Sequence, residues 1–440
     1  MSKGISRRKF VKNSVFGLGS AGLLGGRRIL GRSDPASGQT GNDTRPVIRK
    51  YRPLGRTGFQ VSDISLGFSS NEAIIKTALD AGVNYIDSAE SYQNHRVVGK
   101  AIQGRDRKSI FITSKLEIKE KEGLSRESFI QRFHRCLEEL QTDYIDCMMV
   151  HSPDTVADLL TPGFHSAMEQ MKKEGKLHFV GVSNHGSNHP VVTKESMETI
   201  LTAAAEDGRF DVFLMAYNFL QADNGEKVLA LCNRKGIGTT IMKKNPVGTY
   251  YRIKNYLDRT REQGKEPNRY YADSLARFQK KADQAESFIQ KYHLQNQNEI
   301  RDAAIRFVLN NPHVSSAVCS MRNFDQIEQF IRLSGTDLSQ YDREKLSAYR
   351  KGCGPLYCRH ACGECESACP VGVPVNTIMR YHHYFSAQGK EKYALKKYLA
   401  LQTPKPDVCG DCPGYCESAC SYGVPIQGML IMAHHHLSLV

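Results

Sequence analysis

The chain has 440 residues, of which 24% are charged and 40% are hydrophobic, and its formal net charge is +14. These are ordinary values for a globular protein, and they exclude a largely disordered chain and a multi-span membrane protein. The length suits a large domain with an appendage. Lys and Arg are scattered, and no recognition motif with interleaved aromatic residues accompanies them, so we expect no nucleic-acid partner.

Residues 1–47 are predicted to be a targeting segment followed by a linker. The basic run Ser6-Arg7-Arg8-Lys9-Phe10-Val11-Lys12 precedes a mildly apolar, glycine-rich stretch at 14–26. This arrangement resembles a twin-arginine export signal, which implies a periplasmic or membrane-attached protein. A disordered basic tail is the alternative. The apolar stretch is short for a membrane span and no clear cleavage site follows it, so cleavage and retention as a membrane anchor both stay open.

Residues 48–345 are expected to form a barrel of the (β/α)8 type, an α/β fold. A hairpin is predicted at 48–61, and eight apolar runs then alternate with helical patterns. The expected strands are 62–68, 83–87, 109–115, 144–151, 177–184, 212–218, 236–243 and 314–321. The expected helices are 72–81, 96–103, 126–140, 164–174, 194–206, 225–234, 299–309 and 325–333. Eight such units favour a TIM barrel over an open doubly wound sheet, and the first strand lacks a following Gly-x-Gly-x-x-Gly loop.

A long charged segment at 245–271 follows the seventh predicted strand. It carries five tyrosines, at positions 250, 251, 256, 270 and 271. Its place in the chain predicts a loop over the barrel mouth, where functional loops gather. Tyrosines that stack on a sugar substrate and a plain surface excursion are both consistent with this pattern.

Four polar residues stand at or just after the ends of successive predicted strands: Asp87, Tyr92, Lys115 and His151. Because parallel strands of a barrel end at the same mouth, we expect these side chains to meet there. Reduction of a carbonyl by a nicotinamide needs a proton donor at the carbonyl oxygen, and Tyr92 is the candidate. Lys115 would lower the pKa of Tyr92, Asp87 would keep Lys115 charged, and His151 would hydrogen-bond the carbonyl oxygen.

Residues 48 to about 335 resemble the aldo-keto reductase family. The resemblance rests on the hairpin, on Asp87-Ser88-Ala89-Glu90-Ser91-Tyr92, on Ser114-Lys115 and Val150-His151, and on Gly181-Val182-Ser183-Asn184. It implies that the four residues above form a catalytic tetrad and that NADP or NAD is the cofactor. The implied cofactor contacts are Ser183 and Asn184 at the nicotinamide amide, Tyr217 on the nicotinamide ring, and Ser320, Arg322, Gln326 and Glu328 at the adenosine end. Arg322 favours NADP, because a guanidinium pairs well with a 2′-phosphate.

Nine of the 13 cysteines crowd into the predicted C-terminal domain, residues 346–440. Two similar sets occur, Cys358, Cys362, Cys365 and Cys369, then Cys409, Cys412, Cys416 and Cys420. Each is followed by a Gly-Val-Pro sequence, so the domain contains an internal duplication. The sets resemble the two-cluster bacterial ferredoxin motif, which implies two 4Fe-4S clusters. The resemblance further implies that Cys420 completes the first set and Cys369 the second.

Other uses of these cysteines stay open. Disulfides are common in exported proteins, four-cysteine sets bind zinc, and a single cluster with one degenerate site is a third alternative. Whether clusters would be redox-active or structural is open too.

The leading hypothesis is an exported oxidoreductase that transfers a hydride between a nicotinamide and a carbonyl or alcohol, with sugars as one substrate class, and that carries fused iron–sulfur clusters. The alternative is an exported electron-transfer or scaffold subunit whose barrel is a binding module. A redox partner protein is compatible with either hypothesis.

Overall fold

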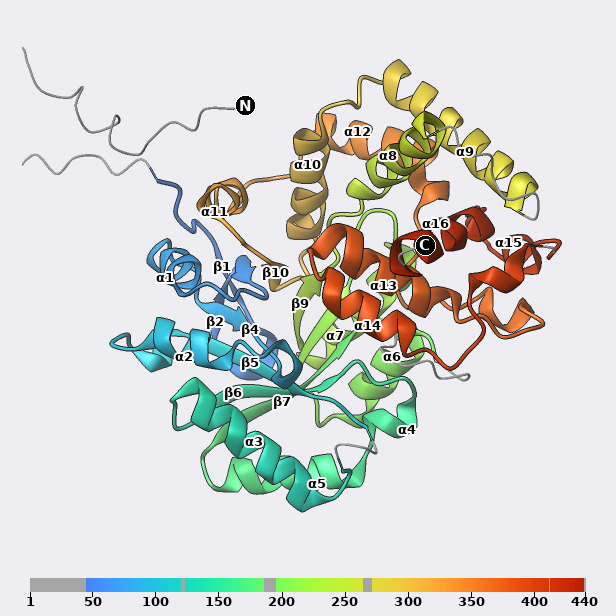
Figure 1. Ribbon diagram of the computed structural model, residues 1–440. Coiled ribbons are helices and arrows are strands. Elements are labelled where there is room, and N and C mark those ends of the chain that lie inside the picture. Colours follow the sequence, from blue (N-terminus) through green and yellow to red (C-terminus); the bar gives the residue numbers. More distant parts are fainter. Residues whose placement is uncertain (1–44, 120–122, 186–194, 264–270, 411, 439–440) are drawn as a thin grey trace, which may run out of the picture. The chain divides into compact units, whose positions relative to one another are not determined.

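A closed barrel of eight parallel strands forms the centre of the described chain (Figure 1). The computed structural model describes residues 45–119, 123–185, 195–263, 271–410 and 412–438. The strands are β3 (Ile64–Leu66), β4 (Tyr85–Asp87), β5 (Phe111–Leu116), β6 (Ile145–His151), β7 (Leu177–Asn184), β8 (Val212–Ala216), β9 (Gly238–Met242) and β10 (Ser316–Cys319). They pair in chain order, and β10 closes the ring by pairing with β3 through Ala317 and Ile64. The predicted barrel is therefore confirmed.

An antiparallel hairpin, β1 (Tyr51–Pro53) with β2 (Gln60–Ser62), precedes the barrel as predicted. Its turn packs against the start of β9, where a Cβ added to Gly55 would lie 2.1 Å from the backbone nitrogen of Gly238. Leu54, which is fully buried, packs with Phe111 and Val212. The hairpin thus closes the end of the barrel from which the strands start, which leaves the opposite end as the mouth.

Helices follow the strands around the barrel. They are α1 (Glu72–Asp80), α2 (His95–Ile102), α3 (Arg126–Leu140), α4 (Val156–Leu159), α5 (Pro162–Lys173), α6 (Met197–Asp207), α7 (Asp223–Lys235), α10 (Gln297–Asn310) and α11 (Phe324–Ile331). Their apolar faces and the outward side chains of the strands form the largest hydrophobic core. The α6 helix begins later than the predicted residue 194, because Ser196 caps it by accepting a hydrogen bond from the amide of Thr199.

The tyrosine-rich segment is helical where it is described, and the prediction of a loop there is wrong. The α8 helix (Gly248–Glu262) covers most of it, and α9 (Ala272–Lys291) begins directly after it. Tyr250 is 2% exposed and Tyr256 is 8% exposed, and both pack in the hydrophobic core of the C-terminal part. These two tyrosines are therefore packing residues. Tyr270 lies outside the described residues.

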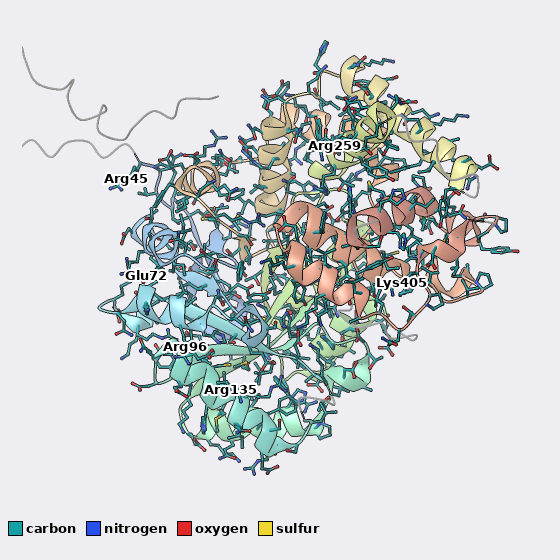
Figure 2. The ribbon with its side chains drawn as sticks, viewed as in Figure 1. Arg45, Glu72, Arg96, Arg135, Arg259 and Lys405 are labelled. Atoms are coloured by element: carbon teal, nitrogen blue, oxygen red, sulfur yellow. The ribbon has the colours of Figure 1, made fainter. Side chains whose placement is uncertain are left out.

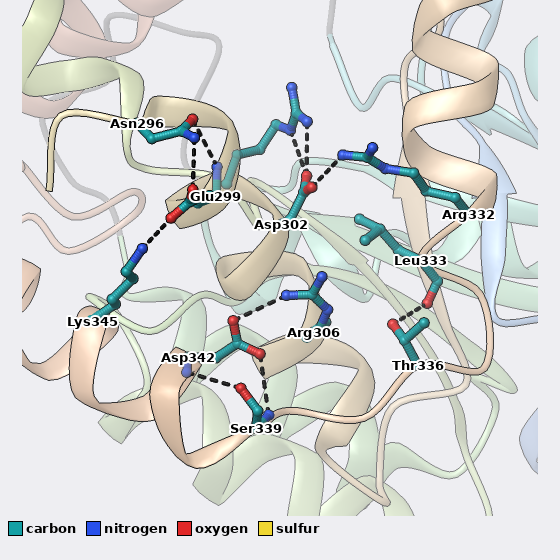
Figure 3. Close-up of polar contacts among 11 residues, drawn as sticks. Asn296, Glu299, Asp302, Arg306, Arg332, Leu333, Thr336, Ser339, Asp342 and Lys345 are labelled. Carbon is teal, nitrogen blue, oxygen red and sulfur yellow. Dashed lines mark hydrogen bonds and ion pairs between the residues drawn. The ribbon is translucent and has the colours of Figure 1, made fainter.

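Helix α12 (Gln340–Cys353) runs across the predicted domain boundary at residue 345 without a break. A capping box of Ser339 and Asp342 begins it, and Asp342 also pairs with Arg306 of α10 at 3.0 Å (Figure 3). Lys345 forms a second ion pair with Glu299 of α10. This helix therefore ties the barrel helices to the C-terminal part, and both belong to one unit that begins at Arg45.

The C-terminal part contains α13 (Val375–Gln388), α14 (Glu391–Leu399), α15 (Tyr415–Ser418) and α16 (Ile426–Ser438). The two halves of its internal duplication contain equivalent hydrogen bonds. Glu366 accepts one from the amide of Asn376 at 2.8 Å, and Glu417 accepts the equivalent one from Gln427 at 2.9 Å. Each cysteine set is thus followed by a helix held in the same way.

Exposed basic side chains lie on separate elements: Figure 2 labels Arg96 on α2, Arg135 on α3 and Arg259 on α8. Within the ranges that the structure describes, no helix combines the length and the apolarity needed to cross a membrane. The predicted export signal lies outside the described residues.

Candidate active site

An ion pair between Asp87 and Lys115 lies at the centre of the barrel mouth. Asp87 is the last residue of β4, and Lys115 lies near the end of the adjacent strand β5. Nζ of Lys115 is 2.6 Å from Oδ1 of Asp87, and it donates a hydrogen bond to the carbonyl of Ser88, also at 2.6 Å. Lys115 is fully buried. Burial lowers its pKa, and the charge of Asp87 opposes that effect, as expected for a carboxylate that keeps a buried ammonium charged.

Tyr92 lies beside this pair, at the end of a short 3₁₀ helix, η3 (Glu90–Tyr92). Nζ of Lys115 is 4.7 Å from the centroid of the tyrosine ring. Burial, and then the charge of Asp87, raises the pKa of Tyr92 well above its ordinary value. The net shift is therefore opposite to the predicted lowering, because burial of the phenol dominates. The phenol stays protonated, which is the form that donates a proton to a carbonyl oxygen.

His151 ends β6 and faces Tyr92, with the two ring centroids 5.8 Å apart. It is 6% exposed. Burial, followed by the charges of Lys115 and of Arg380, lowers the pKa of His151 well below its ordinary value. The imidazole is therefore neutral and has one N–H to donate. The structure thus brings the four predicted catalytic residues together.

Ser183 and Asn184, at the end of β7, lie next to His151. His151 and Ser183 are directly paired in the sheet register. The hydroxyl of Ser183 is buried without a hydrogen-bond partner, and the side-chain amide of Asn184 donates to the carbonyl of Pro153 at 3.1 Å. An unpaired buried hydroxyl is costly unless a ligand satisfies it. A carboxamide, which both donates and accepts hydrogen bonds, fits this position.

The other predicted cofactor residues lie on other elements of the barrel. Tyr217 is 1% exposed, stacks on Phe307 and bonds Glu226 and Asn311 through its hydroxyl. It lies just after the end of β8, and its ring points into the helical layer rather than toward the tetrad. The predicted adenosine contacts, Ser320, Arg322, Gln326 and Glu328, lie after β10 and on α11, and none of them is fully buried. Arg322 donates to the carbonyl of Gln388 in the C-terminal part.

Sequence reasoning missed a buried network that holds the loop of Tyr92. Glu90 of the loop accepts hydrogen bonds from the guanidinium of Arg132 and from the amide of Glu117, the latter at 2.8 Å. Asn94, just after the loop, accepts one from Ser88 at 2.7 Å. A glutamate inside the predicted catalytic motif and an arginine on the apolar face of α3 were the available signals.

Sequence reasoning also missed that the C-terminal part covers the mouth. Nζ of Lys390, just before α14, lies 5.0 Å from the ring centroid of Tyr92 and 4.5 Å from that of Phe68. Tyr384 and Arg380 of α13 lie close enough to change the pKa of Tyr92, Tyr384 raising it and Arg380 lowering it. Side chains from the cysteine-rich part therefore complete the walls of the active site.

Cysteines from one sequence set lie close to cysteines from the other. Burial, followed by the charges of the nearby Cys362 and Cys420, raises the pKa of Cys358 to about 12. Burial likewise raises the pKa of Cys409 to about 12, with Cys416 and Cys369 as the next causes. None of the 13 cysteines forms a disulfide. In the described residues, no three potential ligands are arranged to hold a single metal ion.

A cavity is lined by Cys369, Cys409, Cys412 and Cys416 together with apolar residues. These are the four cysteines of the second implied ligand set. In an iron–sulfur cluster each thiolate binds a different iron, so its ligands stand farther apart than those of one ion. The donor set and its apolar surroundings fit such a group.

The chain is similar to a known family of proteins. Residues 54–351, well over half of the chain, match the model of the Aldo/keto reductase family. Methylglyoxal reductase DkgB of Escherichia coli O157:H7 is 37% identical over 112 residues, a match that covers 25% of this chain and 41% of that protein. Aldo-keto reductase YhdN of Bacillus subtilis is 23% identical over 320 residues, covering 68% of this chain and 92% of the relative.

A holo-form structure of aldo-keto reductase AKR11C1 from Bacillus halodurans aligns with a TM-score of 0.47 and 21% identity, covering 68% of this chain and 96% of that one. The chain spans less than half the length of the methylglyoxal reductases that it matches. The family match nevertheless runs over all eight strands of the barrel, from residue 54 to residue 351. The chain therefore belongs to the aldo/keto reductase family, as the resemblance in its sequence implies.

Proposed function

We propose that the barrel catalyses hydride transfer between NADP or NAD and a small carbonyl or alcohol. The observation that carries this proposal is the assembly of Asp87, Tyr92, Lys115 and His151 at one barrel mouth. The nicotinamide, when bound, supplies or accepts the hydride. Ser183 and Asn184 fit its carboxamide, because the buried hydroxyl of Ser183 has no partner within the described protein.

The residues of the chain supply the remaining chemistry. In reduction, Tyr92 transfers its phenolic proton to the carbonyl oxygen while the neutral His151 donates a hydrogen bond to that oxygen. The ion pair of Asp87 and Lys115 lies beside the ring, where its ammonium stabilises the phenolate that forms. Oxidation of an alcohol uses the same groups in reverse.

Replacing Tyr92 with Phe tests this assignment. Removing a general acid lowers the rate by about 10²- to 10⁴-fold, so we expect kcat to fall by that factor. Nucleotide affinity should be unchanged. Methylglyoxal is a suitable first substrate, since relatives of the chain carry the names methylglyoxal reductase and glyoxal reductase. Undiminished turnover by the variant would contradict the role of Tyr92, and a wild-type protein that binds no nucleotide would favour the scaffold alternative.

We further propose that the two cysteine groups each hold a 4Fe-4S cluster, with Cys420 completing the first set and Cys369 the second. The cavity lined by Cys369, Cys409, Cys412 and Cys416 supports this ligand assignment. So does the mutual proximity of Cys358, Cys362 and Cys420. Such clusters would bind the thiols as thiolates, which burial alone disfavours.

Iron and sulfide analysis of protein purified without oxygen tests the clusters. Wild-type protein should contain about eight iron atoms, and Cys369→Ala and Cys420→Ala should each lose about half of them. Cys353→Ala is the matched control, because this buried cysteine lies outside both sets. Bound zinc instead of iron would contradict the proposal, as would equal iron in the wild-type protein and both ligand variants.

Export by the twin-arginine route is a separate proposal. The paired Arg7 and Arg8 support it, because this route carries proteins that have folded around their cofactors. Replacing both arginines with Lys should leave the protein in the cytoplasm with its iron content unchanged. An unchanged distribution between cell fractions would refute export by this route.

A further inference from the structure

A cavity in the C-terminal part is lined by several basic side chains. It lies between α8 and α13, and Arg252, Arg359, Arg380, His360, His382 and His383 are among its lining residues. No Asp or Glu is found among the described residues that line it. A cavity with three guanidinium groups and no carboxylate has an unbalanced positive charge, which is expensive to keep away from water.

Arg380 is the central group of this cavity. It is 1% exposed and forms no ion pair within the described chain. Its Nε donates to the hydroxyl of Tyr384 at 2.8 Å, and its Nη2 lies 3.4 Å from Nε2 of His185. The remaining nitrogen, Nη1, is buried without a hydrogen-bond partner. A buried guanidinium with an unused donor is suited to a carboxylate or a phosphate, which accept paired N–H bonds.

Two lysines lie near Tyr384, the hydrogen-bond partner of Arg380. Nζ of Lys243 lies 5.2 Å from the ring centroid of Tyr384, and Nζ of Lys390 lies 5.9 Å from it. An anionic ligand would therefore relieve several unfavourable contacts at once.

The basic cavity is connected to the catalytic residues through α13. Arg380 bonds Tyr384, Tyr384 lies next to Lys390, and Lys390 packs on the ring of Tyr92. Arg380 is also one of the charges that lower the pKa of His151. Arg380 is thus close enough to both Tyr92 and His151 to act on them electrostatically.

From this arrangement we propose that Arg380 binds an anionic group, a carboxylate or a phosphate, on the substrate of the barrel. The proposal rests on the proposed hydride transfer and specifies its substrate class: an aldehyde, ketone or alcohol that carries an acidic group. Arg380 then positions the substrate, and the tetrad performs the chemistry. The pyrophosphate of the nucleotide is also anionic, so it is the alternative ligand for Arg380.

Matched pairs of substrates test this proposal on the holoenzyme. One pair is 4-oxobutanoate and 4-oxobutanamide, which differ only in charge at the far end, and the second is glyceraldehyde 3-phosphate and glyceraldehyde. A charge-assisted hydrogen bond corresponds to a factor of about 10 to 100, so we expect at least one acidic substrate to have a kcat/KM higher by about that factor. Arg380→Gln should abolish this preference by raising KM, and Arg380→Lys should restore part of it.

Two controls identify the source of any effect. Arg259→Gln removes the same charge from an exposed position on α8, and it should keep the preference. Affinity for NADPH, measured separately, should be unchanged in Arg380→Gln. A parallel loss of turnover on the neutral and acidic members of a pair, or a loss confined to NADPH affinity, would overturn the proposal.

The proposal and the proposed function fail in different ways. Turnover of the neutral aldehydes without any preference for their acidic partners would overturn the anion site and keep the hydride transfer. If the protein turns over neither the neutral nor the acidic substrates, binding of inorganic phosphate and of succinate can be measured instead. Such binding does not depend on catalysis. Either anion should raise the melting temperature of the wild-type protein and not that of Arg380→Gln, and equal shifts in both proteins would overturn the anion site.

Discussion

Replacing Asp87 with Asn tests whether the buried ion pair holds the active site together. Oδ1 of Asp87 and Nζ of Lys115 are 2.6 Å apart, and the lysine is fully buried. At an effective dielectric constant of about 20, unit charges at this separation attract each other by about 6 kcal/mol. Desolvation of both ions offsets part of this attraction, and removing one partner of a buried pair destabilises a protein by about 3–5 kcal/mol. We expect the free energy of unfolding to fall by that amount.

Urea-induced unfolding at pH 7, followed by circular dichroism, measures this loss. Asp87→Asn combined with Lys115→Met should be more stable than Asp87→Asn alone, because the double variant buries no unpaired charge. In the single variant the folded-state pKa of Lys115 falls further below its ordinary value of 10.5. Between the two pKa values, Lys115 is protonated in the unfolded chain and neutral in the folded protein. The loss of stability caused by Asp87→Asn should therefore shrink as the pH rises toward 10.5. A single variant as stable as the wild-type protein would refute the ion-pair argument.

Burial, and then the charge of Lys115, lowers the pKa of Lys390 to about 8. Because this ammonium is charged only below that pH, KM for an acidic substrate should rise as the pH passes upward through about 8, and Lys390→Met should not show that rise. A Cβ on Gly181 would lie 2.4 Å from the carbonyl oxygen of Val212 and 2.9 Å from Sγ of Cys147. Gly181→Ala should therefore destabilise the barrel by about 1–3 kcal/mol in the same unfolding assay, whereas Gly354→Ala, with no contact closer than 3.8 Å, should not.

The barrel and its tetrad could be predicted because their signals are local. Strands buried on both faces appear as short apolar runs, and three of the observed strands end at the predicted residues Asp87, His151 and Asn184. Each catalytic residue stands at or near such an end. Knowing the strand ends and the fold class was therefore enough to place the tetrad at one mouth.

The helical nature of α8 was missed although a signal was present. Tyr250, Ile253, Tyr256 and Leu257 are all buried, and they repeat at helical spacing. The charged residues between them made the segment resemble a solvated loop. Tyrosine near a predicted mouth suggested ligand contact, but at this spacing its hydrophobic ring served to pack one helix against the C-terminal part.

The walls that α13 and its neighbours add to the mouth could not be predicted from the sequence. Arg380 and Lys390 meet Tyr92 and His151 across more than 200 residues of chain, and no local pattern encodes which helix will lie over the barrel. The pattern of α13 gave no warning either, because it is buried on several faces, with Arg380 and His382 inside. Such residues become visible only when the packing is known.

The position of α13 bears on why a cysteine-rich part is joined to a reductase barrel. Near its start, Asn376 accepts a hydrogen bond from the amide of Ala361 and donates one to the carbonyl of Arg359, both within the first cysteine set. One turn further along the same helix, Arg380 lines the basic cavity. A group that fixes the cysteines would thus fix the position of Arg380 without carrying any electrons. On this argument, loss of the proposed clusters should reduce turnover of an acidic substrate more than that of its neutral partner, because the tetrad lies on barrel strands and their loops, whereas the anion site does not.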